Sequence, residues 1–377
     1  MSDYLNIVDF LMPIDRAIIS NDVGFKDGQI GKVIGAYEQS FPDLDEAHIV
    51  FVGCGEQRGE GLRTTSDGAN EIRKEFYGLF YWHTDIKLAD VGNIKPGNSL
   101  ADTYAALKIV IHELINIGKT VVVLGGSHDL TLAQYYAFAG DKKAIEAVGV
   151  DALIDINIDS PLRSNNFVME LLTGEPNYMK HYNHLAFQSY FVHPRMLETM
   201  DKLRFDCFRV GTVKENIEEM EPVIRNCQLF SFDVSAIATA FAPANIKTPN
   251  GLTGEEACVL MQYAGMSPNM KTIGIYGYQP ELDRQALTAK QISQMLWYLI
   301  DGKSKGHKEV SLEERESFNE FHTSFSEVDT VFLQSRKTGR WWMQMPDKKF
   351  MACSYKDYVV ASNNEYPERW LRMQERP

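Results

Sequence analysis

The sequence predicts an α/β fold in which helices cover both faces of a mainly parallel sheet, giving three layers, α/β/α. Short β-branched runs alternate with amphipathic stretches along most of the chain. Such alternation is typical of parallel strands joined by right-handed helical crossovers. The run Thr120–Leu124 is apolar on both faces, as expected of a strand that is covered from both sides. The apolar content of 44% over 377 residues is enough for a large packed core.

The individual elements follow from hydrophobic periodicity. The expected strands are residues 48–53, 87–91, 120–124, 147–154, 205–210, 229–234 and 272–276. The expected helices, read from apolar residues at helical spacing, are residues 67–80, 102–117, 214–225, 253–264 and 284–300. Strands and helices alternate along the chain, so we expect βαβ units throughout this region.

Two segments fall outside this alternation and suggest a division into three parts. Residues 1–46 are expected to be a helical N-terminal segment, and residues 47–302 the α/β domain. Residues 303–377 are expected to be a C-terminal extension that begins within a polar connector at 301–328. In the extension, the runs at 330–335 and 341–345 on either side of Lys337–Arg340 predict a β-hairpin, followed by a helix at 355–361. We expect the Trp and Met side chains of this tail to pack on the main domain, with a binding or oligomer surface as the alternative.

Charge and cysteine usage exclude several classes of protein. The net charge of −13 and the pI of about 5.2 are unfavourable for binding nucleic acid or anionic lipid. No apolar stretch approaches the length of a membrane helix, and the first residues lack the features of a secretory signal. The five cysteines are scattered and form no CxxC pair, which indicates a reducing compartment. We expect a cytoplasmic protein without nucleic-acid or membrane partners.

Titratable residues follow three of the expected strands. His128 comes after residues 120–124, Asp151 and Asp155 after the apolar run at 147–150, and Asp233 at the end of residues 229–234. In α/β sheets, ligands bind beyond the carboxyl ends of the strands. Histidine together with carboxylates favours Mn²⁺ over Mg²⁺. Taken singly, each Asp is explained as a helix cap or turn residue and His128 as a hydrogen-bonded core histidine.

Order and spacing of these residues resemble a known group of enzymes. Gly-Gly-x-His ends at His128, Asp-Ala-x-x-Asp spans 151–155, Ser-x-Asp ends at Asp233, and Pro-Asn-Gly-Leu-Thr-x-Glu-Glu spans 249–256. This set resembles the ureohydrolase superfamily of arginase, agmatinase and formimidoylglutamase. Asp129, the acidic residue after the histidine, is most similar to the formimidoylglutamase branch. The resemblance implies an arginase-like fold, two Mn²⁺ ions, and a bridging hydroxide that attacks an amidine or guanidine carbon.

The sequence departs from that pattern where the second ion would bind. The resemblance assigns the first ion to His128, Asp151, Asp155 and Asp233, all of which are present. The second ion also needs a histidine at Leu153 and an aspartate at Ser235. Leucine has no ligand atom, and a neutral serine is a poor substitute for a carboxylate. We therefore expect at most one Mn²⁺, and possible loss of both.

Two further departures concern catalysis. The proton-shuttling histidine of arginase corresponds to Val168, and the glutamate that pairs with the substrate cation corresponds to Gly277. The nearest remaining candidates for proton transfer are Asp129 and Asp159.

Positions that bind the amino-acid end of the substrate in arginase correspond to Asn157, Ser164 and Asn166. Arg163 lies beside them and is suited to a carboxylate. The alternative is ordinary turn polarity.

These observations leave two hypotheses. The first is an active hydrolase of the formimidoylglutamase type, with a mononuclear or remodelled metal site. The second, which we favour, is a relative with weak or no amidine hydrolysis that serves as a ligand-binding or assembly component. The implied partner is a small amino-acid-like ligand, and the resemblance alone implies a homo-oligomer.

Overall fold

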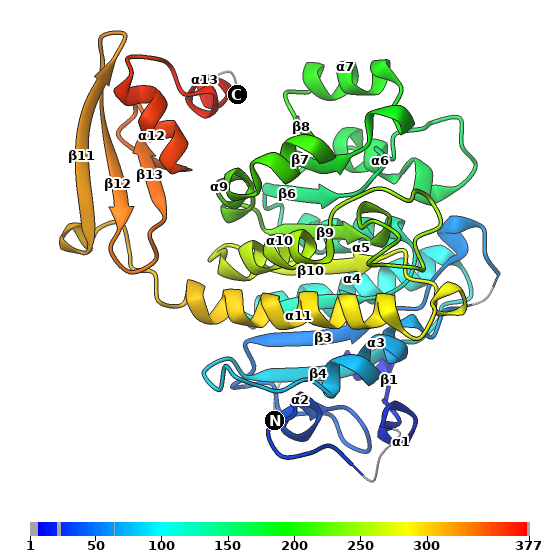
Figure 1. Cartoon of the computed structure of the whole chain (residues 1–377). Helices are drawn as coiled ribbons and strands as arrows, with labels where there is room; N and C mark the ends of the chain where they lie inside the picture. The colour runs from blue at the N-terminus through cyan, green and yellow to red at the C-terminus, as the bar shows by residue number, and fades with distance from the viewer. Residues whose placement is uncertain (1–6, 21–23, 64, 375–377) are drawn as a thin grey trace.

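The computed structural model describes residues 7–20, 24–63 and 65–374. It consists of a large α/β body and a smaller sheet beside it (Figure 1). The central sheet has strand order β1-β4-β3-β5-β10-β9-β6-β7-β8, with β2 also paired to β4. Every described pair in this sheet is parallel except β1 with β4. The predicted α/β fold with a mainly parallel sheet is confirmed.

The strands of the central sheet have these bounds: β1 Leu11–Met12, β2 Gly35–Ala36, β3 Ile49–Gly53, β4 Leu88–Ile94, β5 Thr120–Leu124, β6 Ile145–Val150, β7 Met179–Phe187, β8 Asp206–Arg209, β9 Leu229–Asp233 and β10 Thr272–Tyr276. The strand β7 is absent from the predicted strands, because its buried residues include His181, Asn183 and His184. The strand predicted at 147–154 ends at Val150, so Asp151 and Asp155 lie on the loop that follows β6.

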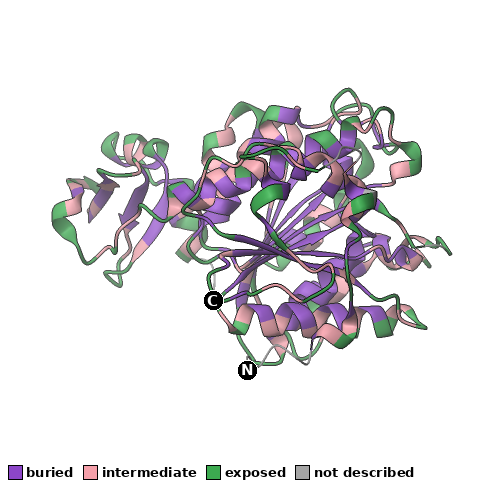
Figure 2. Cartoon of the chain, turned by 90° about the horizontal axis from the view of Figure 1, so that it is seen from below, coloured by how far each residue is buried: buried purple, intermediate pink, exposed green. Residues whose placement is uncertain are grey.

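Helices cover both faces of the sheet, and the strands between them are buried (Figure 2). Their bounds are α1 Arg16–Ile19, α2 Ile30–Val33, α3 Gly68–Tyr77, α4 Leu100–Asn116, α5 Thr131–Ala139, α6 Phe167–Thr173, α7 Pro194–Lys202, α8 Val210–Glu215, α9 Met220–Arg225, α10 Gly254–Met266, α11 Leu287–Gly306, α12 Tyr355–Ser362 and α13 Glu368–Gln374. Both α4 and α10 begin with a capping box, at Ser99 and Thr253, which satisfies backbone N–H groups that the first turn leaves free. No helix in the described part of the chain is long and apolar enough to cross a membrane.

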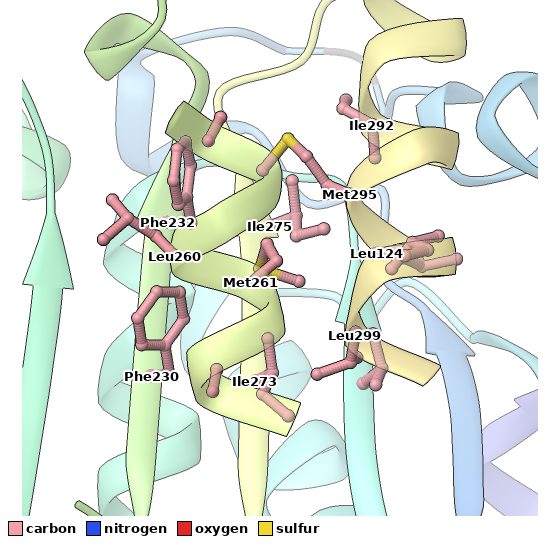
Figure 3. Close-up of a cluster of buried hydrophobic side chains, with 14 of the residues drawn as sticks. Leu124, Phe230, Phe232, Leu260, Met261, Ile273, Ile275, Ile292, Met295 and Leu299 are labelled. Atoms are coloured by element: carbon pink, nitrogen blue, oxygen red, sulfur yellow. The ribbon is translucent and has the colours of Figure 1, made fainter. Parts of the chain in front are cut away.

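The core on one face lies between α10, α11 and the middle strands (Figure 3). Leu260 and Met261 of α10 meet Phe230 and Phe232 of β9 there, all with no exposed surface. Burial of apolar area of this kind supplies most of the stability of a domain. It also holds β9 and β10 rigidly, and the carboxyl end of β9 carries Asp233.

The two ends of the chain differ in part from their predictions. In the N-terminal segment, β1 and β2 add edge strands beside α1 and α2, while residues 1–6 and 21–23 lie outside the described residues. The predicted polar connector at 301–328 is wrong, because α11 continues to Gly306 and β11 spans Phe318–Phe325. Since β11 alternates between buried or half-buried and exposed residues, its exposed polar positions hid the strand in the sequence.

The C-terminal extension contains a four-stranded antiparallel sheet, order β11-β12-β13-β14. The remaining strands are β12 Val328–Ser335, β13 Trp341–Gln344 and β14 Phe350–Cys353. The predicted hairpin is present as β12 and β13, and α12 covers the predicted helix at 355–361.

A buried arginine attaches this sheet to the main body. The Arg225 guanidinium on α9 pairs with Glu221 and donates a hydrogen bond of 2.8 Å to the carbonyl of Trp341. It also lies 4.6 Å from the ring centroid of Trp342. The Arg225 side chain is 4% exposed, so these contacts are largely shielded from water.

Replacing Arg225 should therefore loosen the extension. Arg225→Ala leaves Glu221 buried with reduced charge compensation and should lower the free energy of unfolding by about 3–5 kcal/mol. Urea unfolding followed by tryptophan fluorescence measures this. Lys143→Gln is the control, because Lys143 is 63% exposed and its loss should cost less than about 1 kcal/mol. Equal effects of the two substitutions would contradict this role for Arg225.

Candidate metal centre

The predicted ligand residues meet at the carboxyl edge of four adjacent strands, β5, β10, β9 and β6. After β5, Gly125 and Gly126 have φ of +84° and +81°, and lead into a short 3-10 helix, η4 His128–Leu130. A Cβ at Gly126 would lie 2.6 Å from the carbonyl oxygen of Cys54. Glycine is required at this turn, because L side chains rarely adopt such φ values and the backbone approach is too close. The turn places His128 over the sheet edge.

The imidazole of His128 lies at the centre of the cluster. Its Nδ1 atom is 2.9 Å from Oδ2 of Asp151, 3.4 Å from Oδ2 of Asp155 and 3.8 Å from Oδ2 of Asp233. All four residues are buried. One oxygen of each carboxylate therefore faces the same nitrogen atom, and the structure brings together all four residues that the sequence predicted as ligands.

A chain of hydroxyl groups fixes which nitrogen of His128 faces the carboxylates. Thr131 donates to the carbonyl of His128 at 2.8 Å, so Ser231 donates to Thr131, 2.6 Å away. Ser231 has only one hydroxyl proton, so it accepts a hydrogen bond from Nε2 of His128 at 2.8 Å. Nε2 therefore carries a proton, and Nδ1 faces the carboxylates, where it donates a hydrogen bond to Asp151 when it is protonated. A bound cation would take the place of the Nδ1 proton and leave the lone pair of that nitrogen as a ligand.

The second oxygens of two of these carboxylates are held by the protein. Oδ1 of Asp151 accepts hydrogen bonds from the Ser235 hydroxyl at 2.6 Å and from the Leu153 backbone N–H at 3.0 Å. Oδ1 of Asp233 accepts one from the Ser235 backbone N–H at 2.8 Å. The residues at 153 and 235 therefore satisfy the outer oxygens of both aspartates, while the Oδ2 atoms remain directed at a single position.

The electrostatics of the cluster favour a bound cation. Burial raises the pKa of Asp155 well above its usual range, and the charge of Asp151 raises it further. Burial likewise raises the pKa of Asp233. Burial alone would lower the pKa of His128, but hydrogen bonds to Asp151 and Asp155 raise it well above its ordinary value. Three buried carboxylates cannot all stay ionised beside one imidazole, and a divalent cation relieves this repulsion.

The donor set fits such an ion. His128, Asp151 and Asp233 can each offer a ligand atom, and these atoms lie within 4.8 Å of one another. Oδ2 of Asp155 lies close enough to Nδ1 of His128 to join them. Carboxylate oxygens suit Mn²⁺, Mg²⁺ and Ca²⁺, and an imidazole ligand is more usual for transition metals, so the set fits a divalent ion such as Mn²⁺.

The two proposed proton carriers lie apart from this hydrogen-bonded cluster. Asp129 is fully buried and accepts a hydrogen bond from the Tyr104 hydroxyl. Gly59 packs directly on it, since a Cβ at Gly59 would come within 2.1 Å of Oδ1 of Asp129. Asp159 lies on an exposed loop, where its backbone N–H donates to Asn157.

The predicted substrate-binding residues form the loop and short 3-10 helix before α6. Arg163 forms an ion pair with Glu170. Asn166 donates to the backbone carbonyl of Ser160 at 2.9 Å. Ser164 is buried, whereas Asn157 is exposed.

Sequence reasoning missed two groups near the cluster. The Glu60 carboxylate, on the 3-10 helix η3 Arg58–Glu60, accepts a hydrogen bond of 3.3 Å from Gln279. Burial and the nearby charge of Asp233 raise its pKa to about 7. His184 on β7 lies with its Nε2 3.3 Å from the carbonyl oxygen of Asp151. Neither residue follows the end of a predicted strand, so the pattern that found the other ligands could not find them.

The raised pKa of Glu60 predicts a pH-dependent stability. A carboxyl whose pKa is higher in the folded than in the unfolded chain destabilises the fold once ionised. The penalty is absent below the ordinary value of 4.5 and complete above about 7. Glu60→Gln should therefore raise the free energy of unfolding at pH 8, relative to its effect at pH 4, by roughly 1–3 kcal/mol.

Urea unfolding at the two pH values measures this change. Glu56→Gln is the matched control in the same loop. Burial would raise the pKa of Glu56, but hydrogen bonds from Arg58 lower it overall, so this variant should lose stability at pH 8 relative to pH 4. A pH-independent effect of Glu60→Gln would refute the assignment.

Comparison with known proteins relates this chain to one protein family. The family model described as the arginase family matches residues 47–301. A formimidoylglutamase from Halobacterium salinarum is 23% identical over 294 residues, covering 74% of this chain and 94% of its own. One from Staphylococcus haemolyticus is 23% identical over 269 residues, covering 66% of this chain and 83% of its own.

Solved structures show the same fold. Trypanosoma cruzi formiminoglutamase with Mn²⁺ superposes with a TM-score of 0.66 at 18% identity, covering 74% of this chain and 99% of its own. An agmatine ureohydrolase from Thermoplasma volcanium gives 0.59 at 19% identity, covering 76% and 98%. With the family model matching more than half of its residues, this chain belongs to the arginase family and resembles its formimidoylglutamase members.

Proposed function

We propose that this chain keeps one of the two Mn²⁺ positions implied by its resemblance to ureohydrolases, and that it acts as a ligand-binding or assembly component with weak or no amidine hydrolysis. One observation carries the proposal. The Asp151 and Asp233 oxygens that a second ion would use are already bonded to Ser235 and Leu153. The Oδ2 atoms are directed at one position only.

A second ion would meet two obstacles. Leu153 offers no ligand atom, and Ser235 offers a neutral hydroxyl that already donates to Asp151. Ion binding at Oδ1 of Asp151 would break two buried hydrogen bonds, each to a charged acceptor and worth about 1.5–3 kcal/mol. Residues 153 and 235 thus supply no ligand for a second ion, and the Oδ1 atom of Asp151 is already hydrogen-bonded within the protein.

The surroundings support weak catalysis. Val168 is 1% exposed and packs in an apolar cluster, so no proton carrier stands at that position. Gly277 has φ of +75°, and a Cβ there would lie 2.5 Å from Oδ2 of Asp233. A glutamate at 277 would therefore be both strained and in collision, so the backbone itself excludes a charge partner for a substrate cation from this position.

A single divalent ion, when bound, supplies charge compensation and Lewis acidity. His128 would hold it through Nδ1, and the three aspartates through their Oδ2 atoms. Ser231 and Thr131 keep the imidazole oriented for this. Ser235 keeps Asp151 and Asp233 turned toward the same position.

The alternative function is hydrolysis of the formimidoylglutamase type with a mononuclear or remodelled metal site. One observation favours it. Glu60 is near the charge of Asp233, and its pKa of about 7 suits a general acid or base at neutral pH. This role would be filled from a position that the family pattern does not use.

Metal analysis tests the one-ion proposal. The purified chain, loaded with Mn²⁺ and then desalted, should hold no more than one ion per chain by elemental analysis, and Asp151→Ala should hold none. The double variant Leu153→His with Ser235→Asp restores both missing ligands and should approach two ions per chain. The matched control Ser235→Ala should stay at one. Two ions in the unmodified chain would overturn the proposal.

Turnover separates the two functions. With N-formimidoyl-L-glutamate, arginine or agmatine, the Mn²⁺-loaded chain should release formamide or urea no faster than Asp151→Ala. Robust turnover that disappears in Asp151→Ala would establish the alternative instead. In that case Glu60→Gln should lower kcat and shift its pH profile, whereas a structural role alone would leave the profile unchanged.

A further inference from the structure

The loop that carries two of the expected metal ligands is bonded to the neighbouring strand β7. Residues 151–155 follow β6, which pairs with β7 along the sheet. The backbone N–H of Asp151 donates to the carbonyl of Leu185 at 3.1 Å, and the N–H of Gln188 donates to the carbonyl of Ala152 at 2.9 Å. Two consecutive residues of the ligand loop are therefore held by the end of β7 and the residue after it.

A buried histidine of β7 completes this attachment. His184 is 1% exposed, and its Nε2 lies 3.3 Å from the carbonyl oxygen of Asp151. A carbonyl oxygen can only accept a hydrogen bond, so Nε2 is the donor. In the neutral ring, Nδ1 is then left to accept from the Tyr182 hydroxyl, which lies 3.3 Å away. Gly149 of β6 makes room for this hydroxyl, because a Cβ there would lie 2.2 Å from it. Contacts at both nitrogens thus hold the ring in one orientation.

The backbone of β7 is distorted directly after this histidine. Ala186 is fully buried and has a φ of +70°, a conformation that persists in a residue with a side chain only where its surroundings impose it. The register with β8 shifts between Leu185 and Phe187. Such bulges are frequent next to functional sites, where they redirect side chains and backbone groups. Here the distorted segment is the one that contacts the ligand loop.

The residue that His184 contacts is central to the metal centre. Oδ2 of Asp151 lies closer to Nδ1 of His128 than the Oδ2 atoms of Asp155 and Asp233 do. The other carboxylate oxygen of Asp151 accepts a hydrogen bond from Ser235. The side chain of Asp151 is thus fixed from one direction, and His184 fixes its peptide group from another. Groups that orient metal ligands in this way strongly affect the affinity for the ion.

We propose that His184 is a positioning residue of the metal centre, which raises the affinity for the ion by fixing the backbone of Asp151. The imidazole bonds to the peptide group of Asp151 and does not itself offer a ligand atom to the ion. Without it, the buried carbonyl of Asp151 loses this donor, which is unfavourable. The loop then shifts toward other partners and moves Asp151 and Asp155 away from His128. This inference rests on the metal site that forms part of the proposed function.

Titration of the metal-free chain with Mn²⁺, in competition with a fluorescent chelator, tests the proposal. His184→Leu removes both ring nitrogens and should weaken Mn²⁺ binding by about 10- to 100-fold. His184→Gln keeps an N–H donor and should bind Mn²⁺ more tightly than His184→Leu. Tyr182→Phe removes only the hydroxyl group, so its fold is the least disturbed, and it should weaken binding by a smaller factor than His184→Leu.

A second buried histidine of the same strand provides the matched control. His181 is 3% exposed, and its Nε2 lies 3.1 Å from Asp206 instead of the ligand loop. His181→Leu should lower the melting temperature of the metal-free chain, measured by circular dichroism, and leave the Mn²⁺ affinity unchanged. A purely structural role for His184 would give the same result in His184→Leu.

Three outcomes would overturn the positioning role while the one-ion proposal stands. They are an unchanged Mn²⁺ affinity in folded His184→Leu, an unchanged affinity in Tyr182→Phe, and an equal loss of affinity in His181→Leu. An unmodified chain that binds no Mn²⁺ would instead overturn the metal site itself, and the role of His184 with it.

Discussion

Three buried carboxylates converge on one imidazole nitrogen, and the candidate metal centre at the carboxyl edge of the central sheet depends on this arrangement. Asp151 and Asp155 lie on the loop after β6 and Asp233 is the last residue of β9, yet each directs Oδ2 at Nδ1 of His128. Burying several negative charges together is costly unless a cation neutralises them. The strand order places β5, β9 and β6, which precede or carry these residues, close together in the sheet. The hydroxyl groups of Ser231 and Thr131 keep the imidazole of His128 aligned.

The same arrangement accounts for the contacts made by Leu153 and Ser235, which stand where the resemblance to ureohydrolases implies ligands of a second ion. Carboxylate oxygens that meet neither an ion nor a hydrogen-bond donor are unfavourable in a buried position. Ser235 supplies both a hydroxyl and a backbone N–H to these oxygens, and Leu153 supplies a backbone N–H. The Oδ1 atoms of Asp151 and Asp233 therefore have hydrogen-bond partners within the protein, as the one-ion proposal requires. Gly277 fits beside Asp233 only because it has no side chain.

Much of this site could be predicted from the sequence, because ligands at strand ends leave a pattern of apolar runs followed by polar residues. His128, Asp151, Asp155 and Asp233 follow that pattern, and they lie together in the structure. β7 does not follow it, since buried histidines and an asparagine replace the apolar residues. Glu60 is brought to the site by loop packing against Gln279. Such contacts between distant residues leave no periodic signal.

The cavity between the C-terminal extension and the main body could not be predicted from the sequence, because the contacts that form it also join residues far apart in the chain. The pair formed by Arg372 and Asp206 joins residues 166 positions apart, and either residue alone is an unremarkable surface charge. The docking of the extension brings the two walls of this cavity together, through Arg225 and through contacts of Arg340, Arg369 and Arg372 with the main body.

Anomalous scattering from crystals grown with Mn²⁺ tests the central claim most directly. Data collected at the manganese absorption edge should show one peak per chain, bounded by Nδ1 of His128 and the Oδ2 atoms of the three aspartates, with Ser235 still bonded to Oδ1 of Asp151. Two peaks about 3.5–4 Å apart, the spacing of two-metal sites, would contradict it.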